Sequence, residues 1–155
     1  MKLQQLESQR VQGVLDVCCQ TASHVPQDKS EWKPQPQTKS AKEILEHLAA
    51  SNHGVAAILR GEGGAVKMEK SQRKDISLNT DSYEEALDAL RQSGQALCQS
   101  MATLSDDQLT QTRQMPWGEE WKVSRLLPLA ASHIAYHMGQ LGYLQTMWGD
   151  DQDYL

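Results

Sequence analysis

The sequence predicts an all-α protein folded as a four-helix bundle. Apolar residues recur at intervals of three and four over four long segments, and the alternation expected of strands is scarce. Residues that favour helix ends stand at the borders of these segments. A chain of 155 residues is long enough to bury a core, so we expect one helical-bundle domain over residues 1–155.

The first predicted helix runs from about Lys2 to Ala22. Its apolar face comprises Leu3, Leu6, Val11, Val14, Leu15 and Cys18. Pro26, Pro34 and Pro36 follow in the segment 24–38, which we expect to form a loop because proline lacks the backbone N–H that continues a helix.

The second helix is predicted to begin after Ser40. Glu43 stands three residues further on, which is the spacing of a capping box. The apolar stripe continues to about Leu59, and the glycines at positions 61, 63 and 64 are expected to end the helix.

The third helix is predicted to begin near Asp81, with Glu84 as its capping partner, and to end near Leu104. Its inward residues are expected to be Tyr83, Ala86, Leu87, Leu90, Leu97 and Met101. The polar stretch 69–80 before it carries little pattern. Ser105 can cap one short turn after it.

The last long helix is predicted to start after Ser124, with Pro128 near its first turn and Gly149 beyond its end. The segment 115–118 before it is expected to be a loop with an aromatic anchor. The linkers after the first three helices are long, and they leave the bundle topology open.

Composition excludes several classes of function. The net charge is −5, so we expect no nucleic-acid binding. No apolar run approaches the roughly 18–20 residues that span a bilayer, and the first residues lack the apolar segment of a signal peptide. Three cysteines, two of them adjacent, make a poor disulfide framework and favour a reducing, cytoplasmic setting.

Three histidines stand on predicted apolar helix faces. His133 and His137 are four residues apart in the most apolar stretch of the chain, and that spacing places them on one face. His47 lies on the stripe of the second helix. Two interpretations stay open: three separate core histidines, each hydrogen-bonded, or three ligands of one metal ion. His24 and His53 are expected to face solvent.

The surrounding residues limit which metal site is possible. A di-iron bundle needs Glu-x-x-His motifs, and no glutamate precedes any of the three histidines by three positions. The His-Glu-x-x-His motif of zinc proteases is also absent. Three histidines without a carboxylate favour a single divalent ion with positions left for water or substrate. Gln140 is a candidate hydrogen-bond partner of His137, and Gly139 a candidate for close helix approach.

The chain resembles the DinB/YfiT-like family of bacterial four-helix bundles. The most specific feature is the run His-x-x-x-His-x-Gly-Gln-Leu, and the other matching residues are Trp32, Pro34, Ser40 to Leu48, Tyr143, Leu144 and Gly149. In that family, one histidine of the second helix and two of the last bind a divalent metal, usually zinc or nickel. The resemblance assigns these roles to His47, His133 and His137, and it implies a homodimer.

The family includes thiol-dependent S-transferases and a thiol-dependent isomerase, and many members have no assigned activity. The resemblance therefore implies a metal-dependent enzyme acting on a small-molecule substrate, with a low-molecular-weight thiol as co-substrate. A metal-dependent hydrolase and a non-catalytic metal- or ligand-binding protein stay open as alternatives. The sequence identifies no catalytic residue besides the metal-ligand candidates.

Overall fold

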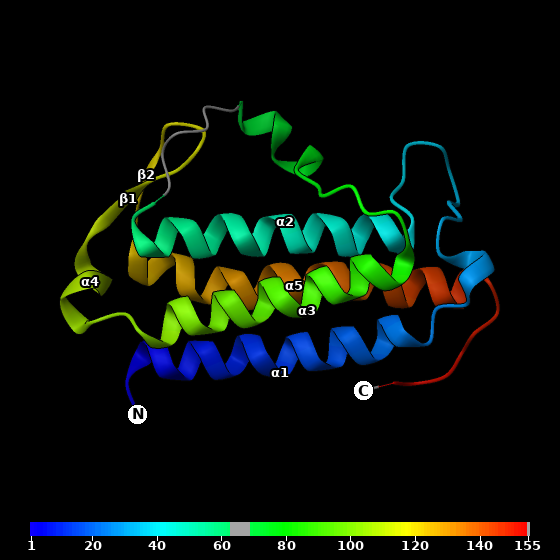
Figure 1. Ribbon diagram of the computed structural model, residues 1–155, viewed down its shortest axis with the longest axis horizontal. Helices are drawn as coiled ribbons and strands as arrows, with labels where there is room; N and C mark the ends of the chain where they lie inside the picture. The colour runs from blue at the N-terminus through cyan, green and yellow to red at the C-terminus, as the bar shows by residue number, and fades with distance from the viewer. Residues whose placement is uncertain (63–68, 155) are drawn as a thin grey trace.

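The computed structural model describes residues 1–62 and 69–154 and confirms the four-helix bundle (Figure 1). The bundle consists of α1 (Leu3–Ser23), α2 (Ala41–Arg60), α3 (Tyr83–Ala102) and α5 (Val123–Met147). Shorter elements occupy the connections: the 3₁₀ helices η1 (Gln27–Lys29) and η2 (Lys70–Asp75), and helix α4 (Asp106–Thr110). Among the described residues, no helix has the length and apolar character that crossing a bilayer requires.

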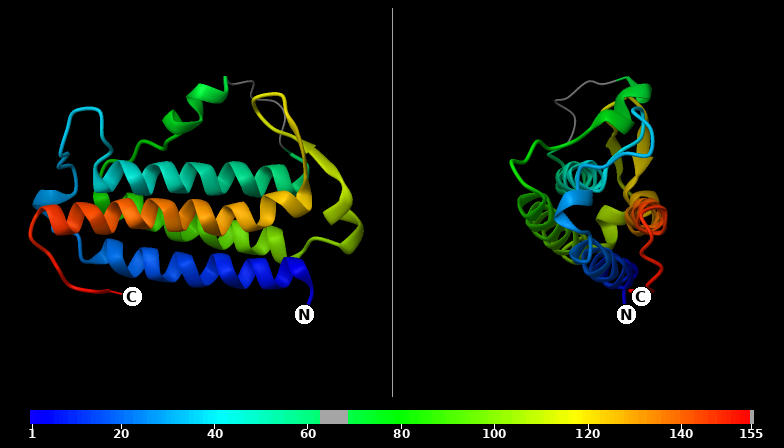
Figure 2. Two further views of the ribbon diagram at one scale, coloured as in Figure 1. Left: turned by 180° about the vertical axis from the view of Figure 1, so that it is seen from behind. Right: turned by 90° about the vertical axis from the view of Figure 1, so that its right-hand side faces the viewer.

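The four long helices form a ring in which each contacts two neighbours. α2 packs against α3 and α5, and α1 packs against the same two helices. The two views of Figure 2 and the hydrogen bonds agree that α1 runs parallel to α5 and antiparallel to α2 and α3. Neighbouring parallel helices cannot be joined by a tight turn, so the long connection between α2 and α3 is a consequence of this topology.

The core is made by the inward stripes of the four helices. Fully buried side chains include Val11, Leu45, Leu48, Leu90, Leu97, Leu127, Ile134 and Leu141. α1 and α3 are tightly packed at Gly94, where an added Cβ would lie 2.2 Å from Cδ2 of Leu15. Glycine at this position therefore lets the two helices pack at short distance.

The predicted boundary of α2 is confirmed. The Ser40 hydroxyl accepts a hydrogen bond from the Glu43 N–H, and the Glu43 carboxylate accepts one from the Ser40 N–H. Gly61 ends the helix with φ of +82°, a conformation that residues with a Cβ rarely adopt. Gly63 and Gly64, also predicted to end the helix, lie outside the described residues.

Two other predicted caps are wrong. α3 is capped by Ser82, whose hydroxyl accepts from the Glu85 N–H, rather than by Asp81 with Glu84. α5 begins at Val123 directly after a strand, so Ser124 lies inside its first turn and caps nothing. The predicted cap of α4 by Ser105 is confirmed.

A β-hairpin that the sequence analysis missed connects α4 to α5. Strands β1 (Thr112–Gln114) and β2 (Glu120–Lys122) pair antiparallel, with Arg113 opposite Trp121. Two residues anchor the turn: Met115, which is 2% exposed, and the predicted aromatic residue Trp117, which is partly buried against the core. The hairpin stands beside the end of α2 and the start of α5 (Figure 1).

Candidate metal centre

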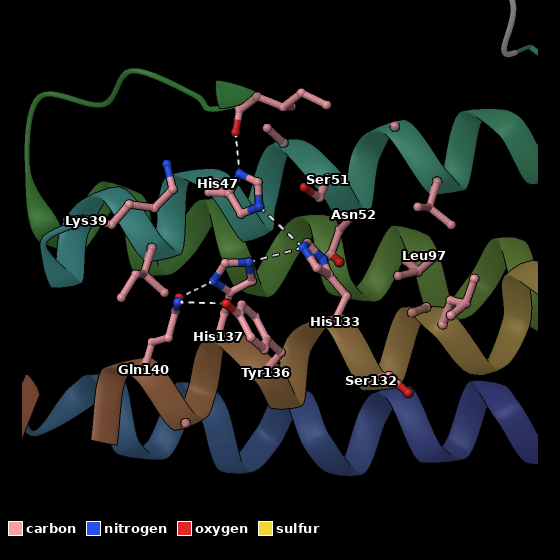
Figure 3. Close-up of a pocket in the computed structure, with 18 of the residues that line it drawn as sticks. Lys39, His47, Ser51, Asn52, Leu97, Ser132, His133, Tyr136, His137 and Gln140 are labelled. Atoms are coloured by element: carbon pink, nitrogen blue, oxygen red, sulfur yellow. Dashed lines mark hydrogen bonds between the residues drawn. The ribbon is translucent and has the colours of Figure 1, made fainter. Parts of the chain in front are cut away.

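His47 of α2 and His133 and His137 of α5 point toward one another across the groove between the two helices (Figure 3). The Nε2 atom of His133 lies 3.3 Å from Nε2 of His47 and 3.2 Å from Nε2 of His137. His47 and His137 are buried and His133 is half-buried. The structure thus brings together the three histidines that the sequence analysis singled out.

The other ring nitrogen of two histidines is held by an oxygen acceptor. Nδ1 of His47 contacts the backbone carbonyl of Ile76 at 2.5 Å, and Nδ1 of His137 contacts Oε1 of Gln140 at 2.7 Å. A carbonyl oxygen only accepts, so each Nδ1 carries the proton and donates it. A neutral ring then presents an unprotonated Nε2, which is the tautomer that binds metal.

Without a cation, the Nε2 lone pairs in this arrangement outnumber the protons that they could accept. Nε2 of His47 and Nε2 of His137 both direct a lone pair at Nε2 of His133, which can donate at most one hydrogen bond. In at least one of these two pairs, the nitrogens therefore face each other without a proton between them. Tetrahedral coordination at about 2.0–2.1 Å would separate ligand nitrogens by about 3.3–3.4 Å, close to the two distances observed.

The electrostatic environment keeps two of these imidazoles neutral. Burial lowers the pKa of His47, and the positive charge of Lys39 lowers it further, although the Ile76 carbonyl opposes the shift. Burial, together with repulsion from His47, lowers the pKa of His137 to about 4. Neutral rings at pH 7 are available as ligands without prior loss of a proton.

The Ile76 carbonyl is positioned by a residue that the sequence analysis missed. Glu46, buried next to His47 in sequence, accepts hydrogen bonds at 2.8 Å from both the N–H and the hydroxyl of Thr80, and its backbone oxygen accepts one from the Leu78 N–H. These bonds hold the segment 76–80 along α2. The sequence feature that could have pointed to this role of Glu46 is the presence of a glutamate on the inward side of an apolar helix stripe.

A cleft of about 1730 Å³ opens over the three histidines between α2 and α5. Its walls are mainly apolar, and Ser51, Asn52, Tyr136 and Gln140 add polar groups near the histidines (Figure 3). Nε2 of Gln140 donates to the Tyr136 hydroxyl at 3.3 Å, so the hydroxyl hydrogen remains available to a bound molecule.

The other candidates of the sequence analysis lie elsewhere. His24 and His53 are exposed, as predicted. The suggestion that Gly139 allows close helix approach is wrong, because an added Cβ there would meet nothing within 4 Å. Burial raises the pKa of Cys18 to about 12 and also raises that of Cys19, which does not favour a reactive thiol at either position.

The sequence model of the DinB superfamily matches residues 13–141, a span that contains all three histidines. The chain belongs to the DinB superfamily. No curated protein matches its sequence.

Solved structures share the fold of this DinB-superfamily chain. A DinB-like protein from Bacillus subtilis has a TM-score of 0.72 at 19% identity, with 95% of this chain and 94% of that chain covered. A conserved protein from Enterococcus faecalis has a TM-score of 0.73 at 16% identity, with coverages of 95% and 97%.

A third neighbour is YfiT from Bacillus subtilis, described as a probable metal-dependent hydrolase with an unusual four-helix bundle topology. Its TM-score is 0.72 at 18% identity, with 92% of this chain and 87% of that chain covered. At these identities the likeness shows the fold alone.

Proposed function

We propose that this DinB-superfamily protein is a metal-dependent enzyme that transfers a low-molecular-weight thiol to an apolar electrophile. The observation that carries the metal is the cluster of three Nε2 atoms, in which at least one close pair has no proton between its nitrogens. His47, His133 and His137 would hold the ion, which we propose to be zinc or nickel. Such an ion lowers the pKa of a thiol or water that it coordinates.

The residues around the cleft favour a thiol over water as the nucleophile. Among the described residues that line it, the single carboxylate is that of Glu62, which is paired with Arg60 at 2.7 and 2.9 Å. Hydrolysis usually needs a base or acid to move protons between water and the leaving group. A thiol has a pKa near 8.5 and can release its proton to solvent without such a residue.

The size of the cleft also suits two reactants. Pockets for one drug-sized ligand are about 300–1,000 Å³, and this cleft has about 1730 Å³. In the proposed reaction, the thiol sulfur forms a bond to an electrophilic carbon, and the leaving group departs with its electron pair. Tyr136 is placed to donate a hydrogen bond to either reactant.

The test compares two substrates on zinc-loaded protein. 1-Chloro-2,4-dinitrobenzene with cysteine or glutathione reports S-transfer, and 4-nitrophenyl acetate without thiol reports hydrolysis. We expect thiol-dependent product above the uncatalysed rate, lost on chelation and in His137→Ala. Turnover of the ester alone would support the hydrolase interpretation, to which the description of YfiT lends support. No turnover of either, with metal bound, would support a binding protein.

A further inference from the structure

The cleft extends on both sides of the three histidines. Toward the start of α5 its walls are apolar, with Val55, Ile58, Leu126, Leu129 and Trp117 among the lining residues. Toward the start of α2 it is lined by Lys39 and Gln37 together with apolar side chains such as Ile44, Leu144 and Met147. The three histidines lie between these two parts, as Figure 3 shows for Lys39 on one side and Leu97 on the other.

Lys39 is the charged group of this second part. It is half-buried, immediately before the Ser40 cap of α2. Its neighbours are paired with carboxylates: Lys33 with Glu43 at 2.6 Å, and Lys42 with Glu31 at 3.5 Å. No carboxylate in the described part of the chain lies within 4.0 Å of Lys39.

Packed aromatic side chains border the cleft near the start of α5. Trp117 and Trp121 pack edge to face with ring centroids 5.6 Å apart, and the Arg125 guanidinium lies 4.0 Å above the Trp121 ring. Leu129 is 43% exposed on the wall of the cleft. Covering such side chains with an apolar ligand removes them from water, which is favourable.

We propose that the cleft binds an elongated organic acid, with its carboxylate at Lys39 and its apolar body along the wall formed by Val55, Ile58, Leu126 and Leu129. This inference rests on the proposed function, because it defines the substrate class of the same site. A neutral apolar molecule would leave the Lys39 charge unpaired, and a small anion would leave the apolar wall exposed to water. Lysine offers a point charge rather than the two-pronged donor of arginine, which suits a carboxylate bound through one oxygen.

The test uses decanoate, 1-decanol and butyrate as probes in calorimetric titrations of metal-free and zinc-loaded protein. Decanoate is expected to bind at least tenfold more tightly than either other probe. Lengthening the acid should improve affinity by up to about three- to fourfold per methylene while the chain follows the wall. Equal affinity for decanoate and decanol, or for decanoate and butyrate, would overturn the inference.

Substitutions separate the two parts of the cleft. Lys39→Met keeps the apolar stem and should weaken decanoate about tenfold without changing decanol, whereas Lys39→Arg should retain binding. Lys33→Met removes a charge from the same segment outside the cleft and should change neither. Leu129→Gln should weaken both ligands alike. Equal effects of Lys39→Met and Lys33→Met would contradict the assignment of Lys39.

The metal-free titration separates this inference from the proposed function. If the protein binds no zinc, the metal-dependent function fails, while a loss of decanoate affinity in metal-free Lys39→Met still supports the carboxylate site. If zinc binds and decanoate does not, the metal centre stands and the substrate class is wrong.

Discussion

At the scale of single residues, His137 is a buried candidate ligand with a contact at each ring nitrogen. It is 6% exposed, its Nδ1 is held by Gln140, and its Nε2 faces His133. We expect His137→Ala to lose bound zinc and to melt at a lower temperature than wild type. A metal at 100 times its Kd stabilises the folded state by about 2.7 kcal/mol.

The measurement is metal content together with thermal unfolding, with and without a chelator. The chelator should lower the melting temperature of the wild type and leave that of His137→Ala unchanged. His53→Ala, at an exposed histidine of α2, should behave like the wild type. If the chelator does not change the melting temperature of the wild type, the three histidines are ordinary core residues.

Gln140 is expected to act on the metal through His137. Replacing it by alanine removes the acceptor at 2.7 Å from Nδ1 and frees the ring to rotate. Loss of such a supporting bond weakens metal binding about 10- to 100-fold. Competition with a zinc-sensitive dye would measure the change. Gln140→Glu keeps an acceptor and should preserve affinity; if it weakens zinc as much as alanine does, Gln140 has no orienting role.

The three histidines of this centre could be predicted from the sequence more readily than the groups that hydrogen-bond to them. Helical periodicity placed His47, His133 and His137 on inward faces, and spacing within one helix put Gln140 near His137. The acceptor of His47 is the backbone carbonyl of Ile76, a group that every residue carries, so nothing in the sequence distinguishes it. Its position depends on the long connection between α2 and α3, which shows little pattern.

At the scale of elements, the approach of α1 to α3 depends on Gly94. An added Cβ would lie 2.2 Å from Cδ2 and 2.8 Å from Cδ1 of Leu15, so Gly94→Ala must displace a fully packed side chain. Overpacking costs about 1–3 kcal/mol, which outweighs the gain of about 1 kcal/mol in helix propensity. We expect a net loss of unfolding free energy in urea.

Gly139→Ala is the matched control for Gly94→Ala. Its added Cβ meets nothing within 4 Å on the side of α5 that faces the cleft, so propensity alone should act and stability should rise by about 0.5–1 kcal/mol. If both variants changed stability in the same direction, the α1–α3 contact would not be as tight as the structure indicates.

The capping box of α2 should make stability depend on pH. Burial raises the pKa of Glu43, but the hydrogen bonds from Lys33 and from the Ser40 N–H outweigh it and lower the pKa below the ordinary 4.5. A carboxylate with a lowered pKa in the folded state adds stability above pH 4.5 that disappears as the pH falls through its folded pKa.

Glu43→Gln removes this titration and keeps an acceptor oxygen for the cap. We expect it to cost up to about 1 kcal/mol at pH 7, because the largely exposed ion pair with Lys33 contributes little, and to cost progressively less as the pH falls below 4.5. Denaturant midpoints at several pH values would show the two curves converging in acid. A difference that persists at pH 3 would assign the loss to the side-chain shape rather than to the charge.

Elements whose ends carry capping signals could be located from sequence, as Ser40, Glu43 and Gly61 show for α2. The hairpin could not, because its strands have three residues each and are largely polar, so no alternating pattern emerges. Its presence also explains the wrong cap at Ser124. The chain enters α5 directly from β2, and the first helical residue is therefore Val123.

At the scale of the whole molecule, the topology produces the centre. Because α2 and α3 run parallel, their connection must return along the length of the bundle, and its segment 76–80 lies against α2 beside His47 (Figure 1). Helix lengths and faces follow from periodicity. The direction of α3 does not, since a long linker permits either direction.

We expect the protein to form a homodimer through an exposed apolar row of α5 whose members also line the cleft. The four tryptophans are partly buried and pack against the core. The exposed apolar side chains of α5 are Leu129, Tyr136, Tyr143 and Met147, and the first three recur every seventh residue along one side of the helix. A row of this kind is favourably covered by the same row of a second copy about a twofold axis.

Light scattering at micromolar concentration should give the mass of two 17.3 kDa chains. Tyr143→Glu places a charge in the row and should convert the dimer to a monomer with unchanged helix content. Leu3→Glu, at a 44% exposed position at the start of α1, should leave the dimer intact. If Leu3→Glu dissociates the dimer and Tyr143→Glu does not, the interface lies on α1 instead. If the wild type is a monomer, the prediction of a dimer is wrong. If the dimer forms as predicted, the exposed side of the cleft borders the interface, and the Tyr143→Glu monomer should bind decanoate with altered affinity.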